Sequence, residues 1–272
     1  MGGYYRFTIL GCGSSPGVPR PNGDWGACDP DNPKNHRLRS SFLIERIIGE
    51  GAEEKVTRLV IDTGPDFRVQ MLKAKATHLD AAVYTHPHAD HIHGIDDLRS
   101  YALTQKQMMN VYGDSFTIHR LNDAFGYCFQ TPKGSPYPPI LKAHEIQAYE
   151  PFSIEGEGGA IPLMPYRQIH GNIQSLGFRT GNIAYCTDVN AFPEETLPYL
   201  MGLDVLVISA LQYNSHPSHF SLDDALNWIK RLAPKRAILT HMHIALDYES
   251  VRKATPANVL PAYDGLFFTA AL

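Results

Sequence analysis

The sequence predicts an α/β protein, because short strand-like runs are interspersed along the chain with segments of helical periodicity. The runs rich in β-branched and aromatic residues, which are typical of strands, cover residues 4–10, 40–45, 57–62, 81–86, 175–180, 182–188, 204–210, 236–241 and 265–272. Several of these runs stop at an aspartate or a histidine, so polar side chains stand where loops begin. The predicted helices cover residues 66–75, 94–105, 193–202, 221–234 and 247–254.

Length and composition narrow the class of protein. The chain has 272 residues, of which 43% are hydrophobic, so it can bury a large core, and we expect residues 1–272 to form a single domain. A net charge of −4 gives no overall electrostatic reason to bind nucleic acid or an anionic membrane. The N-terminus lacks the pattern of a signal peptide and no apolar run is long enough to span a membrane, so we expect a cytoplasmic protein.

The first strand, at residues 4–10, leads into the glycine-rich turn "GCGSSPGVPR", whose glycines permit close approach of the backbone to a phosphate. Residues 17–39 and 131–139 are dense in Pro, Gly, Asn and Asp, which predicts long loops of the kind that form lids or binding surfaces. We expect Tyr137, in the second of these loops, at the rim of a pocket. Residues 34–39, "KNHRLR", form a modest basic patch.

The four cysteines lie far apart and form no C-x-x-C pair, which argues against a zinc ribbon or a dense disulfide framework. We expect free thiols at all of these positions, which are Cys12, Cys28, Cys128 and Cys186.

The stretch "THPHADHIHG", residues 85–94, follows a predicted strand and contains the pattern H-x-H-x-D-H. Side chains alternate along an extended segment, so His86 and His88 can point to one side. If a helix begins there, Asp90 and His91 project together from its first turn. Imidazole and carboxylate suit Zn²⁺, Mn²⁺ or Fe²⁺, so this spacing predicts a metal site rather than a chance cluster of surface histidines.

Three later residues could complete the site, since each of them lies beside a predicted strand: His170, Asp188 and His241. A carboxylate is the natural group to bridge two dications, because its negative charge offsets their repulsion. An aspartate at a strand end can also cap a turn, so it is the joint placement that favours metal binding.

These residues resemble the metallo-β-lactamase-fold hydrolases across essentially the whole chain. The resemblance implies an αβ/βα sandwich of two facing sheets, with two divalent metal ions, Zn²⁺ or Mn²⁺, along one edge. It implies that Asp62, in "VIDTG", orients ligands without binding metal. It further implies that one metal is held by His86, His88 and His170, the other by Asp90, His91 and His241, with Asp188 between them.

The start of the chain and the element "SHFSL" resemble the phosphodiesterase branch of these hydrolases. His219 precedes Ser221, which forms a capping box with Asp224 at the start of the predicted helix 221–234. By the resemblance, His219 serves near the leaving group, and a histidine is suited to donate a proton or hold a phosphate there. His216 and His243 fit the pattern less well. We expect Asp90 to steer the attacking water as well.

The spacing between His170 and Asp188 separates two branches. The tRNA 3′-processing endonucleases generally carry a long arm there, whereas here the two positions are only 18 apart (188 − 170) and two predicted strands fill the interval. The chain is most similar to the phosphoribosyl 1,2-cyclic phosphate phosphodiesterases of phosphonate breakdown. It departs from them in the early loop, where Cys28 alone replaces a cysteine-rich structural zinc site.

We therefore expect a phosphodiesterase in which two metals activate a bridging hydroxide against a small cyclic phosphate or nucleotide-like ester. Neither a membrane nor nucleic acid is an expected partner. Three further functions stay open: a tRNA 3′-processing endonuclease, a thioester hydrolase of the glyoxalase II kind, and a non-catalytic metal- or nucleotide-binding module. The fold alone does not name the substrate.

Overall fold

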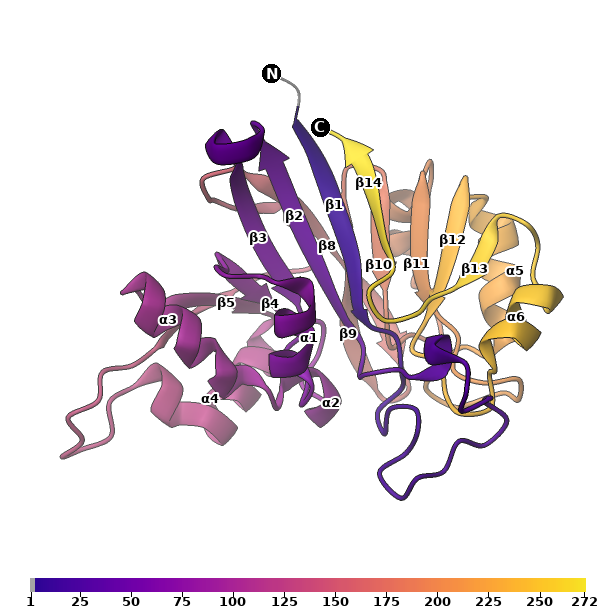
Figure 1. Cartoon of the computed structure of the whole chain (residues 1–272), viewed down its shortest axis with the longest axis horizontal. Coiled ribbons are helices and arrows are strands. Elements are labelled where there is room, and N and C mark those ends of the chain that lie inside the picture. The colour runs from indigo at the N-terminus through magenta and orange to yellow at the C-terminus, as the bar shows by residue number, and fades with distance from the viewer. Residues whose placement is uncertain (1–2) are drawn as a thin grey trace.

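The computed structural model describes residues 3–272, and in it two β-sheets face each other with helices on their outer sides (Figure 1). The strand orders are β14-β1-β2-β3-β4-β5-β6 and β13-β12-β11-β10-β9-β8-β7. This arrangement confirms the predicted α/β class and the αβ/βα sandwich.

The first sheet is antiparallel from β14 to β3 and parallel from β3 to β6. Its strands are β1 (Gly3–Gly11), β2 (Ser41–Ile48), β3 (Lys55–Ile61), β4 (Ala81–Val83), β5 (Met109–Gly113), β6 (Leu141–Glu145) and β14 (Phe267–Ala271).

The second sheet is antiparallel from β7 to β10 and parallel from β10 to β13. Its strands are β7 (Phe152–Ile154), β8 (Ile161–His170), β9 (Ile173–Thr180), β10 (Ile183–Cys186), β11 (Val205–Ser209), β12 (Arg236–Thr240) and β13 (Val259–Pro261).

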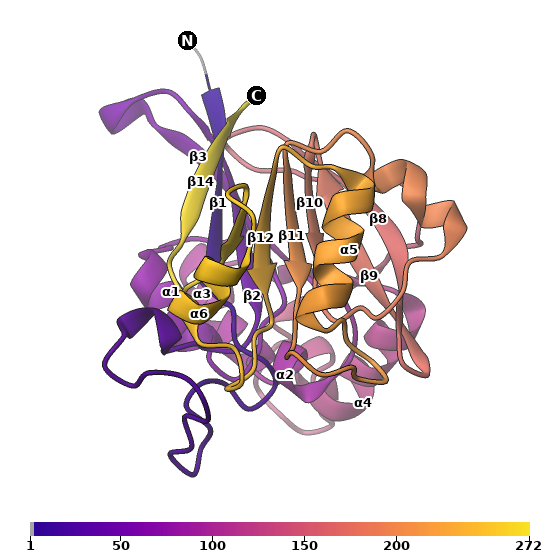
Figure 2. The same cartoon turned by 90° about the vertical axis from the view of Figure 1, so that its right-hand side faces the viewer.

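Helices α5 and α6 lie over the outer face of the second sheet (Figure 2). The α-helices are α1 (Phe67–Ala74), α2 (Ala89–Ile92), α3 (Arg99–Gln105), α4 (Ser115–Phe129), α5 (Leu222–Leu232) and α6 (Tyr248–Ala254). The 3₁₀ helices are η1 (Pro33–Asn35), η2 (Gly51–Glu53), η3 (Ile95–Leu98) and η4 (Glu194–Leu200). None of the described helices is long and apolar enough to cross a membrane.

Two hydrophobic clusters hold the layers together. One fills the space between the sheets, where the ring of Phe42 on β2 stacks on that of Tyr185 on β10, 4.7 Å between centroids and 3° from parallel. The other packs α1, α3 and α4 against the outer face of the first sheet, through side chains such as Phe67 and Leu121. Burial of these apolar faces is the main force that joins helix to sheet and sheet to sheet.

The predicted elements occur where the sequence places them, and Ser221 and Asp224 form the expected capping box of α5. The predicted helix 193–202 is instead the 3₁₀ helix η4, which contains Pro198. Proline lacks the N–H that an α-helical hydrogen bond needs. No element is expected from the sequence between residues 106 and 174, yet β5, α4, β6, β7 and β8 all lie there.

Candidate metal centre

The predicted site residues follow strands whose carboxyl ends meet at one edge of the sandwich, the lower edge in Figure 1. Asp62 follows β3 and His86 lies just beyond β4 in the first sheet. In the second sheet, His170 ends β8, Asp188 lies two residues beyond β10, and His241 follows β12. The short helix α2 adds Asp90 and His91. Because these strands run in the same direction, residues as far apart in the sequence as Asp62 and His241 lie at one edge.

The first group of side chains contains His86, His88, His170 and Asp188. The Nδ1 atom of His88 lies 3.0 Å from His86 Nε2 and 3.2 Å from His170 Nε2. Both Nε2 atoms are 3.6 Å from Asp188 Oδ2. His88 Nδ1 offers either one proton or one lone pair, so only one of the two nitrogen contacts can be a normal hydrogen bond.

The second group contains Asp90, His91, His241 and, again, Asp188. His91 Nε2 lies 3.3 Å from Asp90 Oδ2 and 3.2 Å from Asp188 Oδ1. His241 Nδ1 lies 3.1 Å from the same Asp188 oxygen. Asp188 thus offers one carboxylate oxygen to each group, which is the arrangement of a bridging ligand.

Hydrogen bonds on the outer side orient three of the histidines. The Oγ1 hydroxyl of Thr85 donates to Asp62 Oδ2 at 2.8 Å, which leaves it to accept from His86 Nδ1 at 2.9 Å. His91 Nδ1 donates to Asp62 Oδ2 at 2.7 Å, and His170 Nδ1 donates to the carbonyl of Ser218 at 2.7 Å. Each Nε2 is then a lone-pair acceptor that faces the cluster.

The buried acceptor atoms of the cluster show whether these residues fit a metal ion. Within residues 3–272, the buried atoms Asp90 Oδ2 and His91 Nε2, which lie 3.3 Å apart, have no hydrogen-bond partner. Buried acceptors that face one another are unfavourable unless a cation lies between them. The donor set of imidazoles and carboxylates suits a divalent transition metal, so the described residues fit two such ions.

The electrostatics of the cluster agree with this conclusion. Burial and the neighbouring His91 lower the pKa of His86 well below its usual value. Burial by itself lowers the pKa of His91. The neighbouring carboxylates of Asp188, Asp90 and Asp62 outweigh this effect and raise its pKa well above the usual value. Buried carboxylates therefore need a positive partner here, which metal ions would supply.

Backbone strain marks the same strand ends. Asp62, Asp188 and His241 have φ angles of 65°, 49° and 56°, in the left-handed region. A residue other than glycine pays about 1–2 kcal/mol there, and such strain gathers at functional sites. The backbone thus supports a built site at these three positions.

His219 lies beside the cluster, in the segment before α5. Its ring stacks on that of His241 at 4.9 Å, and its buried Nδ1, which has no hydrogen-bond partner among the described residues 3–272, is 4.0 Å from Asp188 Oδ2. Burial, with His241 close by, lowers the pKa of His219 to about 3. His216 lies 5.2 Å from His219, ring to ring, and His243 contacts Arg20 instead, 2.6 Å from its Nη2.

Two contacting residues were missed at the sequence level. Thr85 links Asp62 to His86, and its position directly before the H-x-H pattern was the available signal. Ser40 Oγ lies 3.0 Å from His241 Nδ1 and donates to the carbonyl of Gly13. Nothing in the local sequence distinguishes Ser40 from the neighbouring Ser41.

One of the predicted ligands reaches the surface. His88 is exposed, whereas the other six predicted ligands are buried.

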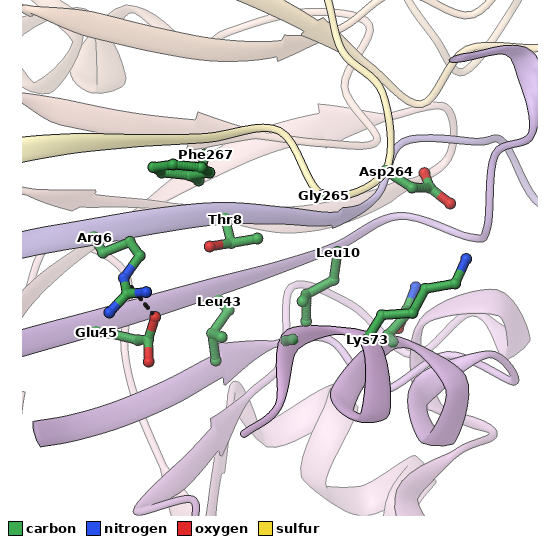
Figure 3. A pocket seen from close by; sticks show the side chains of 11 residues that line it. Arg6, Thr8, Leu10, Leu43, Glu45, Lys73, Asp264, Gly265 and Phe267 are labelled. Carbon is green, nitrogen blue, oxygen red and sulfur yellow. Dashed lines mark ion pairs between the residues drawn. The ribbon is translucent and has the colours of Figure 1, made fainter. Parts of the chain in front are cut away.

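A pocket of about 280 Å³ elsewhere is lined by Arg6, Glu45, Lys73, Asp264 and Phe267 and contains none of the predicted site residues (Figure 3).

The two predicted long loops, residues 17–39 and 131–139, differ from what the sequence predicted. Arg37 is buried and Arg39 pairs with Asp66, so residues 34–39 form no free basic patch. Cys28 is buried and donates to the carbonyl of Ile244; among residues 3–272 no metal-competent cluster includes it. Pro138 and Pro139 lie against α3, and the loop that carries Tyr137 projects away from the centre (Figure 1).

The chain is similar to known proteins over most of its length. The beta-lactamase superfamily domain matches residues 57–242. A protein of Porphyromonas gingivalis described as an octanoyltransferase is 31% identical over 265 residues, or 96% of this chain. The chain spans about half, 51%, of that relative's length.

Solved structures extend the likeness over the whole chain. A diphosphatase from the PhnP family has 31% sequence identity and a TM-score of 0.86, with 99% of this chain and 98% of that chain covered. The metallo-beta-lactamase fold protein YhfI from Bacillus subtilis has 17% identity and a TM-score of 0.71, covering 99% of this chain and 100% of the other. The second likeness concerns the fold alone.

Proposed function

Since the chain belongs to the beta-lactamase superfamily and is a metal-dependent hydrolase, we propose that it hydrolyses a small phosphodiester, a cyclic phosphate or a nucleotide-like ester. The observation that carries this proposal is Asp188, which offers Oδ1 to one group of ligands and Oδ2 to the other. We assign His86, His88 and His170 to one metal and Asp90, His91 and His241 to the other. Residues 1–272 act as one domain in this proposal.

When bound, the two metals lower the pKa of a water and stabilise the charge on the phosphoryl oxygens. The side chains have separate tasks. Asp90, besides its assigned role as a ligand, steers the attacking water toward phosphorus. Asp62 and Thr85 hold His91 and His86 in the required orientation.

His219 faces the departing oxygen in this scheme. The water, which gives up one proton, forms a bond to phosphorus, the bond from phosphorus to the departing oxygen breaks, and that oxygen takes up a proton. Burial keeps the imidazole neutral in the free protein, whereas an adjacent phosphate anion favours its charged form and raises its pKa. Substrate binding therefore prepares His219 to donate.

A second candidate is hydrolysis of a diphosphate. It is favoured by the 31% identical solved structure, which is described as a diphosphatase. Both reactions place one phosphorus atom at the metals, so they differ in the leaving group, an alcohol in a diester and a phosphate in a diphosphate. The octanoyltransferase name of the other relative carries no assignment here, because the chain spans about half of that protein.

Three competing functions would each leave a different signature. A tRNA endonuclease needs room for its arm between His170 and Asp188, and β9 and β10 occupy this interval. A thioester hydrolase has no use for His219 at the leaving group. A binding module would hold ligand without turnover.

The test is hydrolysis by metal-loaded protein of bis-p-nitrophenyl phosphate, 2′,3′-cyclic nucleotides, phosphoribosyl 1,2-cyclic phosphate and ADP, beside a pre-tRNA and a thioester. We expect turnover of a small phosphate substrate, loss of activity in Asp188→Ala and a fall of about 10²-fold in His219→Ala. His119→Ala, an exposed histidine on α4, is the matched control. No turnover of any phosphate substrate by protein that holds two metals would overturn the proposal.

A further inference from the structure

We propose that a cavity beside the metal centre binds the nucleoside part of the substrate. This inference rests on the proposed function. The cavity has a volume of about 430 Å³ and lies between the start of α4 and the β8–β9 hairpin. Ser115, Phe116, Gln147, Arg167 and Gln174 are among the residues that line it. Pockets of this size, about 300–1,000 Å³, are typical of small-molecule sites.

The first sheet places one wall of the cavity next to the centre. The parallel register pairs Val83 with Tyr112, so Asp114 at the start of α4 lies level with Thr85 on the neighbouring strand. Adjacent strands are about 5 Å apart, and Thr85 directly precedes His86. The cavity therefore begins one strand away from a predicted ligand.

The second sheet closes the other side. Leu176, which lines the cavity, donates its backbone N–H to the carbonyl of Thr85 at 2.8 Å. Gln174 pairs with Ile169, the residue before His170. The cavity thus lies at the same end of β8 and β9 as His170, and one of its residues is hydrogen-bonded to the residue before His86. A substrate whose phosphorus lies at the metals can extend its organic part into this space.

The lining has the chemistry of a nucleoside site. Phe116 is 57% exposed, so its ring face is available for a base to stack on. Gln147, Arg167 and Gln174 bring two amides and a guanidinium to the lining. Their amides and guanidinium can meet the hydrogen-bonding edge of a base, and the carboxylate of Glu145 can accept from ribose hydroxyls.

Two other occupants fit the lining less well. A second phosphate group would be repelled by Glu145 and Asp114, which line the same cavity as Arg167. An acyl chain would match the buried Ile146 and Leu176 but would bury the two glutamine amides without partners, which is costly. A neutral, planar group with polar edges matches both the apolar floor and the polar rim.

The matched pair of variants is Phe116→Ala and Phe267→Ala. Both rings are exposed, at 57% and 62%, and Phe267 lies in the separate pocket of Figure 3. We expect saturation-transfer NMR to detect adenosine, guanosine, cytidine or uridine bound to metal-loaded wild-type protein and to Phe267→Ala, with the signal lost in Phe116→Ala. We expect Gln174→Ala to change the preference among the four bases.

The kinetic measurement uses the ratio of kcat/KM for a 2′,3′-cyclic nucleotide to that for phosphoribosyl 1,2-cyclic phosphate, which has no base. Loss of stacking should lower this ratio roughly 10-fold or more in Phe116→Ala and leave it unchanged in Phe267→Ala. Equal ratios in the two variants, or nucleoside signals that do not depend on Phe116, would overturn the inference while phosphate turnover persists. Failure of the proposed function looks different, because turnover of every phosphate substrate is then absent.

Discussion

The carboxylate of Asp62 accepts a hydrogen bond from Nδ1 of His91 at 2.7 Å, and both side chains are fully buried. The same carboxylate accepts from the backbone N–H and the hydroxyl of Thr85. Asp62 therefore determines which nitrogen of His91 carries the proton and leaves Nε2 as the acceptor that faces Asp90 and Asp188.

Replacement of Asp62 by asparagine should weaken metal binding. Asparagine Oδ1 can still accept from the Thr85 N–H, so its NH₂ group would face His91 Nδ1. That nitrogen must then be an acceptor, which moves the proton to Nε2. We expect metal affinity to fall by about 10–100-fold, measured by competition with a chromophoric chelator. Asp80→Asn, at the other end of the first sheet, is the control; equal affinities would contradict the role of Asp62.

Phe42 should be critical for stability, because it joins the two sheets through its stack with Tyr185. Phe42 is 1% exposed, and deletion of a buried aromatic ring costs about 3–5 kcal/mol. We expect Phe42→Ala to lower the free energy of unfolding in urea by this amount. Phe267→Ala, which removes an exposed ring, should change it by less than about 1 kcal/mol. Similar losses in both variants would argue against sheet-to-sheet packing at Phe42.

Cys28 should hold no metal. The buried thiol lies 3.9 Å from the guanidinium of Arg37, a cation that disfavours a second positive charge, and burial raises its pKa. We expect atomic absorption to give two metal ions per chain in both the wild type and Cys28→Ser. A third ion in the wild type that is lost in Cys28→Ser would contradict this prediction.

Asp264 should make stability depend on pH. Burial raises the pKa of this carboxyl from 3.8 to about 7, although the backbone N–H groups of Leu38 and Cys12 donate to it. The folded state therefore binds the proton more tightly than the unfolded chain. The contribution to stability is present below about pH 4 and is lost as the pH rises through about 7.

The measurement is the free energy of unfolding in urea from pH 5 to pH 8. Each unit by which the folded pKa exceeds the unfolded pKa corresponds to about 1.4 kcal/mol. Asp264→Asn cannot ionise, so its stability relative to the wild type should increase with pH across this range. Parallel pH profiles for the two proteins would show that Asp264 titrates as it does in the unfolded chain.

The sequence predicted most strands and helices because their patterns are local. The capping box at Ser221 and the run of buried residues in β11 need no distant partner to be recognised. Helix α4 was not predicted, because its sequence mixes polar and aromatic residues and its backbone departs from helical geometry at Phe125. It is stabilised by packing Ile118 and Leu121 against the first sheet, which is a tertiary effect.

By itself, the sequence determined the fold class and the types and positions of the candidate metal ligands, since strand periodicity and the spacing H-x-H-x-D-H can be recognised from neighbouring residues. The tertiary structure decided what those side chains meet. It alone brings His170, Asp188 and His241 from the second sheet against His86 and His91 from the first, because parallel strands end at one edge. It alone shows that Thr85 and Ser40 contact the cluster, and that Phe116 and Gln174 border one cavity. Such contacts join residues far apart in the chain, and their geometry depends on how the layers pack.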